Sequence, residues 1–155
     1  TYRNSAAFIA EAANLRRVCL EEGIDQPNFG GRMHYLRWEQ PQTLRIWEQA
    51  GMSYDSTLSY ADHAGFRCGT CFEYPAFDPV VGEQLNLRIR PLIAMEASVI
   101  ASQYMGLGIG EAALNKFLEL KSTCKAVSGC FTLLWHNNGL MQKELKDIYT
   151  GTLES

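Results

Sequence analysis

Apolar residues recur at helical spacing in four parts of the chain. The first part begins after Asn4, which is well suited to cap a helix, and stops at Gly23. Its apolar positions lie three or four residues apart, with charged residues between them: Phe8, Ala12, Leu15 and Cys19. Similar patterns predict a helix that starts at Pro41, a long helix over 111–127 and a last helix over 140–149.

Short runs with strand character separate the predicted helices. Residues 52–56 and 66–71 are brief runs bounded by glycine or polar turn residues. Leucine and isoleucine alternate with polar residues over 85–90, and we expect the strand to resume over 92–95. The apolar run 130–135 has the pattern of a parallel strand buried on both faces. Strands that alternate with helices predict an α/β sheet or barrel.

The composition narrows the class of partners. The chain has 155 residues, enough for one ordinary domain, and a formal net charge of -3 at pH 7. Nucleic-acid binding needs clustered Lys and Arg that neutralise phosphates, so we expect no nucleic-acid partner. No apolar run approaches the ~18 residues that a bilayer crossing requires, so we expect no membrane span.

The cysteines bear on the compartment. They are Cys19, Cys68, Cys71, Cys124 and Cys130. An odd number of scattered cysteines is not typical of a disulfide framework, so we expect a cytoplasmic protein rather than one associated with the cell envelope. Cys68 and Cys71 form a lone CxxC motif. Redox or zinc chemistry is one interpretation, but zinc needs further ligands nearby, so two buried thiols beside a strand are favoured.

Three clusters contain side chains suited to hydrolysis: 32–35, 54–56 with Asp62 and His63 nearby, and 135–137. Hydrolysis of an amide or ester requires a base, a group that holds the developing oxyanion, and an acid. His136 follows a predicted buried strand and so emerges at the rim of the sheet, where it either meets a ligand or is hydrogen-bonded in a turn. Asp55 has the alternative of capping a turn, and Arg32 that of a plain surface residue.

Metal binding and sugar binding are two further hypotheses. His34, Asp62 and His63 are ligand types suited to zinc or another divalent ion. Asp62 and His63 are adjacent, however, and adjacent residues of an extended segment point to opposite sides. Five aromatic residues either line a sugar-binding groove, because sugar rings stack on aromatic faces, or belong to the core. They are Tyr35, Trp38, Tyr54, Tyr60 and Trp135.

The clusters resemble a known family in their residues, order and spacing. The motifs are GRMHYLR over 31–37, YD over 54–55, SYAD over 59–62, GFRCGTC over 65–71 and LWHN over 134–137. They resemble a bacterial polysaccharide deacetylase-like family, divergent members of the chitooligosaccharide and peptidoglycan deacetylase superfamily. The resemblance covers nearly the whole chain. It implies that residues 1–155 are the C-terminal part of a catalytic domain, an α/β fold built as a partial distorted (β/α)7-type barrel of short parallel strands alternating with helices, with the N-terminal strands missing.

The resemblance also implies roles for individual residues. Leu133-Leu134-Trp135-His136 matches the motif whose histidine is the general acid. Arg32 takes the place of an arginine in the wall of the groove, and Asp55 lies where the family sets the surroundings of the histidine. The expected catalytic residues are therefore His136, Arg32 and Asp55, and the expected substrate-binding residues are Tyr35, Tyr60, Trp135 and Asn137. His34, which stands where proline is common in the family, is the expected metal ligand.

The implied activity is metal-dependent deacetylation of an acetylated polysaccharide, oligosaccharide or amino sugar by the full-length protein, with zinc or a similar divalent metal. The family's Asp-Asp pair and His-rich motif have no counterpart here, so we expect the other metal ligands upstream of Thr1. We expect this chain alone to be inactive or to associate, as a homo-oligomer, through an exposed sheet edge. Two alternatives are a non-catalytic carbohydrate-binding domain and a structural or partner-binding module with Trp38 and Trp47 at its interface.

Overall fold

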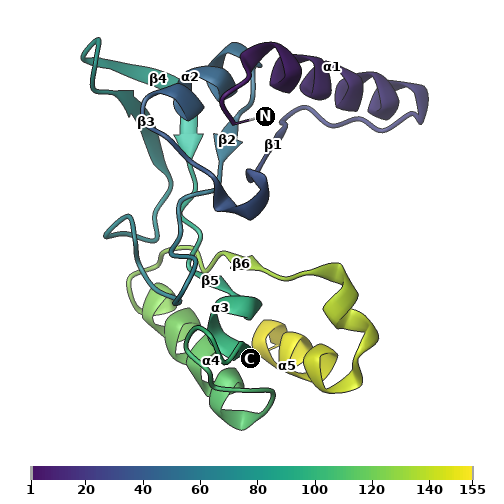
Figure 1. Ribbon diagram of the computed structural model, residues 1–155, viewed down its shortest axis with the longest axis vertical. Coiled ribbons are helices and arrows are strands. Elements are labelled where there is room, and N and C mark those ends of the chain that lie inside the picture. Colours follow the sequence, from purple (N-terminus) through teal and green to yellow (C-terminus); the bar gives the residue numbers. More distant parts are fainter. Residues whose placement is uncertain (1, 155) are drawn as a thin grey trace. The chain divides into compact units, whose positions relative to one another are not determined.

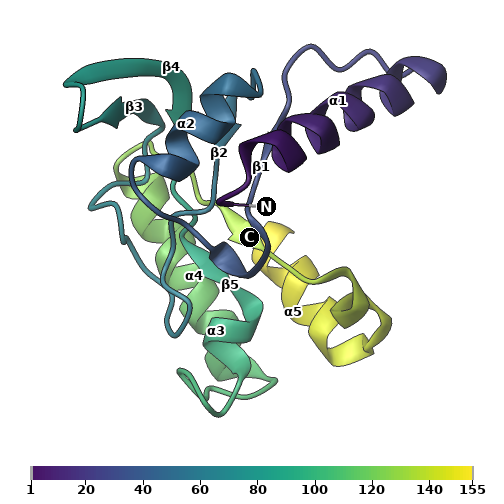
Figure 2. The same cartoon turned by 45° about the horizontal axis from the view of Figure 1, so that its top comes forward.

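The structure, a computed structural model, describes residues 2–154 and divides into two compact units. Unit 1 comprises Thr1–Leu58 and Glu73–Arg90, and unit 2 comprises Ser59–Phe72 and Pro91–Ser155. Figure 1 labels the elements of both units, and Figure 2 shows them turned by 45°. Each unit therefore draws on two separate stretches of the chain.

Unit 1 contains a four-stranded sheet in the order β1-β2-β4-β3. Its strands are β1 (Gly30–Gly31), β2 (Tyr54–Asp55), β3 (Tyr74–Asp78) and β4 (Glu83–Ile89). β1, β2 and β4 run parallel, whereas β3 and β4 form an antiparallel pair. The register places Asp55 of β2 between Gly31 of β1 and Ile89 of β4. Asp55 therefore lies in an interior strand of the sheet.

Two α-helices complete unit 1. α1 (Ser5–Glu21) begins where the sequence predicts, because the Asn4 side chain accepts a hydrogen bond from a backbone N–H of the first turn at 3.0 Å. α2 (Gln42–Gln49) packs against α1 and against the sheet. The ring centroids of its Trp47 and of Phe8 in α1 lie 5.0 Å apart. Trp47 is buried, so the apolar face of α2 forms the core of unit 1.

Unit 2 contains a two-stranded parallel sheet and three α-helices. These elements are β5 (Ala94–Met95), α3 (Glu96–Ile100), α4 (Glu111–Ala126), β6 (Leu133–Leu134) and α5 (Lys143–Glu154). α4 contacts both α3 and α5, and its Phe117 and Cys124 are buried in the core of this unit. Short 3-10 helices occur at His34–Leu36 (η1) in unit 1 and at Asn137–Met141 (η2) in unit 2.

The helices predicted from apolar spacing are confirmed as α1, α2, α4 and α5, with ends that differ by a few residues. The alternating run 85–90 is confirmed as β4, and the run 92–95 contains β5. The run 52–56 contains the two residues of β2. β3 and α3 are not predicted, because β3 is short and only partly apolar and α3 has too few residues to show a helical period.

One strand prediction is wrong, and another is confirmed only in part. Residues 66–71 form turns, since the Gly69 N–H donates to the Phe66 carbonyl at 2.9 Å and Gly69 has a φ of 68°. The run 130–135 contributes only the two residues of β6, which are half-buried rather than buried on both faces. Among residues 2–154, β6 pairs with β5 alone, so its other edge has no strand beside it.

The architecture is mixed α/β, with parallel strands and helices. The strands of the described residues form one sheet of four and one sheet of two, and neither closes into a barrel. Over the same residues, every helix is too short or too polar to cross a membrane. Three candidate residues, Arg32, Asp55 and His136, lie at or just after the carboxyl ends of parallel strands.

Candidate functional site

Two parallel strands of unit 2 end at the same edge of their sheet. β5 ends at Met95, which is in register with Leu134 at the end of β6. Glu96 follows β5 directly, and His136 comes two residues after Leu134. Because the carboxyl ends of parallel strands lie side by side, the two side chains meet although 40 positions separate them in the sequence.

Glu96 holds His136 through two contacts. Its Oε1 accepts a hydrogen bond from the His136 backbone N–H at 3.1 Å and is also in hydrogen-bond contact with the ring atom Nδ1. The Glu96 side chain is 10% exposed, whereas that of His136 is 57% exposed. A carboxylate only accepts hydrogen bonds, so Nδ1 carries the hydrogen and Nε2 is left to exchange protons. The pair is an exposed imidazole oriented by a buried carboxylate.

The second oxygen of Glu96, Oε2, is buried and has no hydrogen-bond partner within residues 2–154. A buried polar atom without a partner is costly, so packing alone does not account for a carboxylate at this position. Sequence reasoning missed Glu96. The signal was present, because Glu96 directly follows the apolar run 92–95, just as His136 directly follows the apolar run 130–135.

Trp135 and Asn137 flank His136 but differ in their surroundings. The Trp135 ring packs against two other rings. Its centroid lies 5.7 Å from that of Phe117 and 5.3 Å from that of Tyr149. Asn137 is exposed and begins η2. The structure therefore uses the Trp135 ring to pack unit 2, and of the two predicted substrate-binding residues Asn137 is the one that faces solvent.

Tyr60 of unit 2 stacks on His63, with ring centroids 3.9 Å apart. The His63 ring atom Nδ1 lies 2.8 Å from an Asp62 carboxylate oxygen, and this contact lowers the pKa of Asp62. Asp62 and His63 thus face each other, contrary to the expectation for an extended segment, because the chain bends here. Both side chains are exposed, so this is a local surface pair.

Asp55 of unit 1 caps a turn, which is the alternative that its sequence context indicates. Its Oδ1 accepts hydrogen bonds from the Thr57 N–H at 2.9 Å and from the Thr57 hydroxyl, and that hydroxyl oxygen accepts from the Met33 N–H at 3.0 Å. Asp55 is only 1% exposed. Burial raises the pKa of Asp55 to about 6, against the hydrogen bonds from Thr57 and the charge of Arg32.

Arg32 lies in the same unit as Asp55 and interacts with it electrostatically. Partial desolvation lowers the pKa of Arg32, the charge of Arg90 also lowers it, and the negative charges that Tyr54 and Asp55 can carry oppose this shift. Arg90 in turn lies over the ring of Tyr54, 3.8 Å from its centroid. Arg32 and Asp55, both predicted as catalytic, are therefore electrostatic neighbours.

His34 and Tyr35 form part of η1 in unit 1. Their ring centroids are 4.2 Å apart, and Tyr35 is exposed with a φ of 59°. A small hollow of about 170 Å3 lies beside them, lined by Tyr2, Met33, His34, Tyr35 and Arg37. Within residues 2–154, no group of three His, Cys, Asp or Glu side chains is placed to hold a metal ion. The predicted ligand His34 therefore does not belong to a metal-binding set formed by the described residues.

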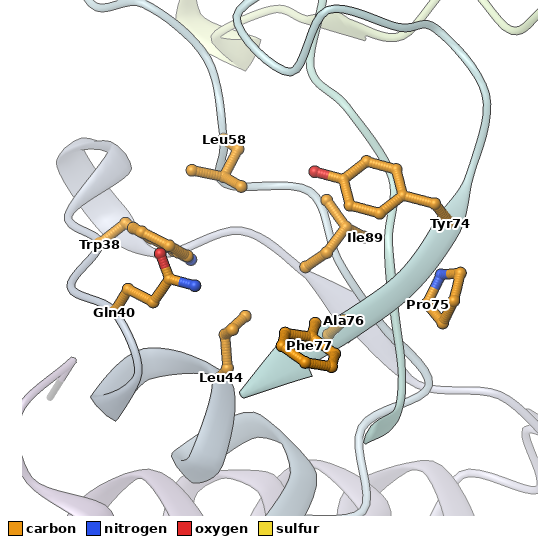
Figure 3. A pocket seen from close by; sticks show the side chains of 9 residues that line it. All are labelled: Trp38, Gln40, Leu44, Leu58, Tyr74, Pro75, Ala76, Phe77 and Ile89. Carbon is orange, nitrogen blue, oxygen red and sulfur yellow. The ribbon is translucent and has the colours of Figure 1, made fainter. Parts of the chain in front are cut away.

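A larger hollow of about 250 Å3 opens on the sheet of unit 1 (Figure 3). Figure 3 shows Trp38 and Gln40 on one side of this hollow and Tyr74 on another, with the Tyr74 hydroxyl turned inward. Trp38 is one of the aromatic residues proposed for a sugar groove. Tyr74 and Phe77 were missed because β3 was not predicted. The full lining is Trp38, Gln40, Leu44, Leu58, Tyr74, Pro75, Ala76, Phe77 and Ile89.

The predicted site residues divide between the units. Unit 1 holds Arg32, His34, Tyr35 and Asp55, and unit 2 holds Tyr60, Trp135, His136 and Asn137. Within unit 1 the structure brings Arg32 near Asp55, and within unit 2 it joins His136 to Glu96. Comparison with protein-family models, with curated proteins and with solved structures returned no match to this chain.

Proposed function

We propose that the full-length protein is a hydrolase that removes acetyl groups from an acetylated polysaccharide or amino sugar, with His136 as its general acid. The observation that carries the proposal is the contact of the His136 ring with the buried Glu96 carboxylate at the ends of two parallel strands. An imidazole held in this way has a defined orientation and one ring nitrogen free to transfer a proton.

The role of His136 follows from the chemistry of amide cleavage. When the C–N bond of an N-acetyl group breaks, the departing nitrogen must receive a proton. A protonated His136 would donate the proton on Nε2, while Glu96 stabilises the positive ring through Nδ1. The exposure of the His136 side chain, 57%, lets a substrate reach Nε2. Glu96 acts through His136 and is a positioning residue.

Arg32 and Asp55 enter the proposal as a pair in unit 1. The charge of each group opposes the pKa shift of the other, which supports a shared role within unit 1, in which Asp55 sets the electrostatic surroundings of Arg32. The barrel-type fold and the divalent metal that the resemblance implies belong to the same proposal. When bound, that metal would polarise the acetyl carbonyl, and the steps proposed for this chain are those of its own side chains.

The proposal is tested by acetate release from N-acetylated chito-oligosaccharides, measured with the full-length native protein that contains this sequence. We expect His136→Gln to lower kcat roughly 100-fold or more, because general acid catalysis contributes about 100- to 10,000-fold. Glu96→Gln should lower kcat with little change in KM. Asp147→Asn, which neutralises an exposed carboxylate of the same unit, serves as the matched control.

Circular dichroism of each variant checks that the fold is intact. Full turnover by a folded His136→Gln variant would exclude His136 as the general acid. Absence of acetate release by the wild-type protein, over a panel of N- and O-acetylated oligosaccharides, would overturn the activity itself.

A second candidate is a non-catalytic carbohydrate-binding domain, favoured by the hollow that contains Trp38 and Tyr74 (Figure 3). Aromatic rings beside a side-chain amide, here Gln40, suit a sugar ring with its apolar faces and hydroxyl edges. Titration with chito-oligosaccharides, followed by the amide signals of unit 1, tests this candidate. Binding that is lost in Trp38→Ala, in a protein without acetate release, would favour it over the hydrolase.

A further inference from the structure

Four of the five cysteines belong to unit 2, and three of them meet at one turn. The turn spans residues 124–130, from Cys124 in the last turn of α4 to Cys130 beyond its end. The Cys130 N–H donates a hydrogen bond to the Cys71 carbonyl at 3.1 Å, and the Gly129 N–H donates to the Cys124 carbonyl at 2.8 Å. These two bonds fold the turn against Cys71, so that Cys124 and Cys130 lie beside it.

Gly129 permits this close approach. A Cβ atom added at Gly129 would lie 2.2 Å from the Cys71 sulfur, which is shorter than any non-bonded contact between such atoms. Only glycine therefore lets the Cys71 side chain sit against the turn. Burial, and after it a hydrogen-bond contact with the Cys71 thiol, raise the pKa of Cys124 to about 12. The Cys124 carbonyl oxygen lies 3.5 Å from the same Cβ position at Gly129, so Cys71 and Cys124 adjoin one another there, and both are free thiols.

The exposure of the three thiols differs. Cys130 is exposed, Cys71 is 5% exposed and Cys124 is 1% exposed. Within residues 2–154, the thiols and the carboxylates or histidines around them provide no three-ligand geometry for a metal ion. Two free thiols that adjoin the same glycine, Cys71 through its sulfur and Cys124 through its carbonyl, are, however, a starting arrangement for a disulfide.

We propose that Cys71 and Cys124 form a reversible oxidation site, at which a peroxide converts the two thiols into a disulfide. The proposal does not rest on the proposed function, because neither His136 nor Glu96 takes part. Cys71 reacts first, because more of its surface is open to a small oxidant than that of Cys124. The raised pKa of Cys124 also keeps that thiol protonated near neutral pH.

The reaction balances with hydrogen peroxide as the oxidant. The Cys71 sulfur attacks one peroxide oxygen, the O–O bond breaks, and a sulfenic acid and one water molecule form. The Cys124 sulfur then attacks the Cys71 sulfur, gives up its proton and expels the second water molecule. The two sulfurs together lose two electrons, which reduce the peroxide. A dithiol reductant reverses the reaction.

Peptide mapping of the whole chain after treatment with hydrogen peroxide tests the proposal. Free thiols are blocked by alkylation, and trypsin, which cuts after Lys and Arg, then places Cys71 in peptide 68–88, Cys124 in peptide 122–125 and Cys130 in peptide 126–143. We expect peptide 68–88 to be linked to peptide 122–125, with a mass about 2 Da below the sum of the two. Dithiothreitol should remove the link.

Two cysteine variants identify the sulfurs, and a third is the matched control. Cys71→Ser and Cys124→Ser should abolish the link, whereas Cys68→Ser, in the other half of the CxxC motif, should keep it. Amide hydrogen exchange gives a second measurement, made on the wild-type chain. The amide of Cys130, which is hydrogen-bonded to the Cys71 carbonyl, should exchange more slowly after oxidation than before.

Three results would overturn the proposal. They are a disulfide within peptide 68–88, which joins Cys68 to Cys71, a link from peptide 68–88 to peptide 126–143, and oxidation that stops at sulfinic or sulfonic acid without any link. The mapping uses the wild-type chain, so a cysteine variant that fails to fold does not affect the decision.

Discussion

Glu96 Oε1 meets His136 at two points, the backbone N–H and the ring nitrogen Nδ1. A single acceptor that binds both the main chain and the ring restricts rotation of the side chain about its first two bonds. The buried carboxylate therefore sets both the position and the hydrogen placement of an exposed imidazole. This relationship is the basis of the catalytic role proposed for His136.

The hydrogen placement on His136 is directly measurable. We expect the neutral ring to carry its hydrogen on Nδ1, because Glu96 accepts there. Glu96→Leu removes the acceptor and should shift the ring toward the Nε2–H form. Two-bond 15N correlation spectra of the imidazole distinguish the two forms, and His63, paired with Asp62 in the same unit, provides an internal reference. A wild-type ring with its hydrogen on Nε2 would contradict the assignment.

The raised pKa of Asp55 predicts that the free energy of unfolding falls as the pH rises. Its pKa is raised from 3.8 to about 6, so the folded state retains a proton at a pH where the unfolded chain has lost it. Folding is therefore less favourable above this window than below it. Over its whole titration, from well below pH 4 to well above pH 6, this group alone should lower the free energy of unfolding by about 3 kcal/mol, of which about 2 kcal/mol falls between pH 4 and pH 6.

The matched variant for this prediction is Asp55→Asn, which cannot ionise. Urea unfolding is followed by fluorescence in a Trp135→Phe background, which leaves Trp38 and Trp47 of unit 1 as the only tryptophan reporters. The free energy of unfolding is compared at each pH between chains with and without the Asp55→Asn substitution. The other carboxylates titrate in both chains, so their contribution cancels in the difference. A difference that stays constant from pH 4 to pH 6 would be inconsistent with the raised pKa.

A side chain at Gly30 is expected to destabilise unit 1. It is the register partner of Tyr54 across β1 and β2, and a Cβ atom at Gly30 would lie 2.3 Å from the Tyr54 ring. Arg90 stacks 3.8 Å from the centroid of the same ring and limits its movement. Gly30→Ala should therefore destabilise unit 1 by about 1–3 kcal/mol, the usual cost of overpacking.

Gly31→Ala is the control for Gly30→Ala. A Cβ atom there meets Trp47 at 3.8 Å, an ordinary van der Waals distance. We expect its effect on the free energy of unfolding in urea to be small, within about 0.5 kcal/mol. Equal destabilisation by the two substitutions would show that loss of glycine flexibility, and not the Tyr54 contact, is the cause.

The Arg45–Asp78 pair is expected to stabilise unit 1 more than an exposed ion pair does. Arg45 Nε lies 2.5 Å from Asp78 Oδ2, and Nη2 lies 3.2 Å from Oδ1. The hydrogen bond from Arg45 holds the pKa of Asp78 below its usual value. The Asp78 side chain is 3% exposed, so Arg45→Met leaves a carboxylate without its counter-ion inside the fold.

The control for Arg45→Met is Arg17→Met, since the Arg17–Glu21 pair is more than half exposed on both sides. We expect Arg17→Met to change the urea midpoint very little and Arg45→Met to lower it several times more. Similar midpoints for the two variants would place the Arg45–Asp78 pair among surface pairs of little consequence.

Sequence patterns predicted those features that depend on neighbouring residues. Helical spacing located α1, α2 and α4, and the run Asp-Ser-Thr at 55–57 indicated the turn that Asp55 caps. The position of His136 after an apolar run correctly placed it beyond β6. Patterns failed at residues 66–71, because turn-forming glycine there outweighs the apolar residues.

The amino-acid sequence by itself determined the helices, the turn cap at Asp55 and the location of His136 at a strand end, because each depends on a few consecutive residues. Tertiary structure alone decided the partner of His136, the pairing of Gly30 with Tyr54 and the meeting of Cys71 with the turn at 124–130. These contacts join residues far apart in the chain, and they arise from which strands and turns become neighbours. Periodicity does not encode that choice, since many pairings bury the same apolar faces.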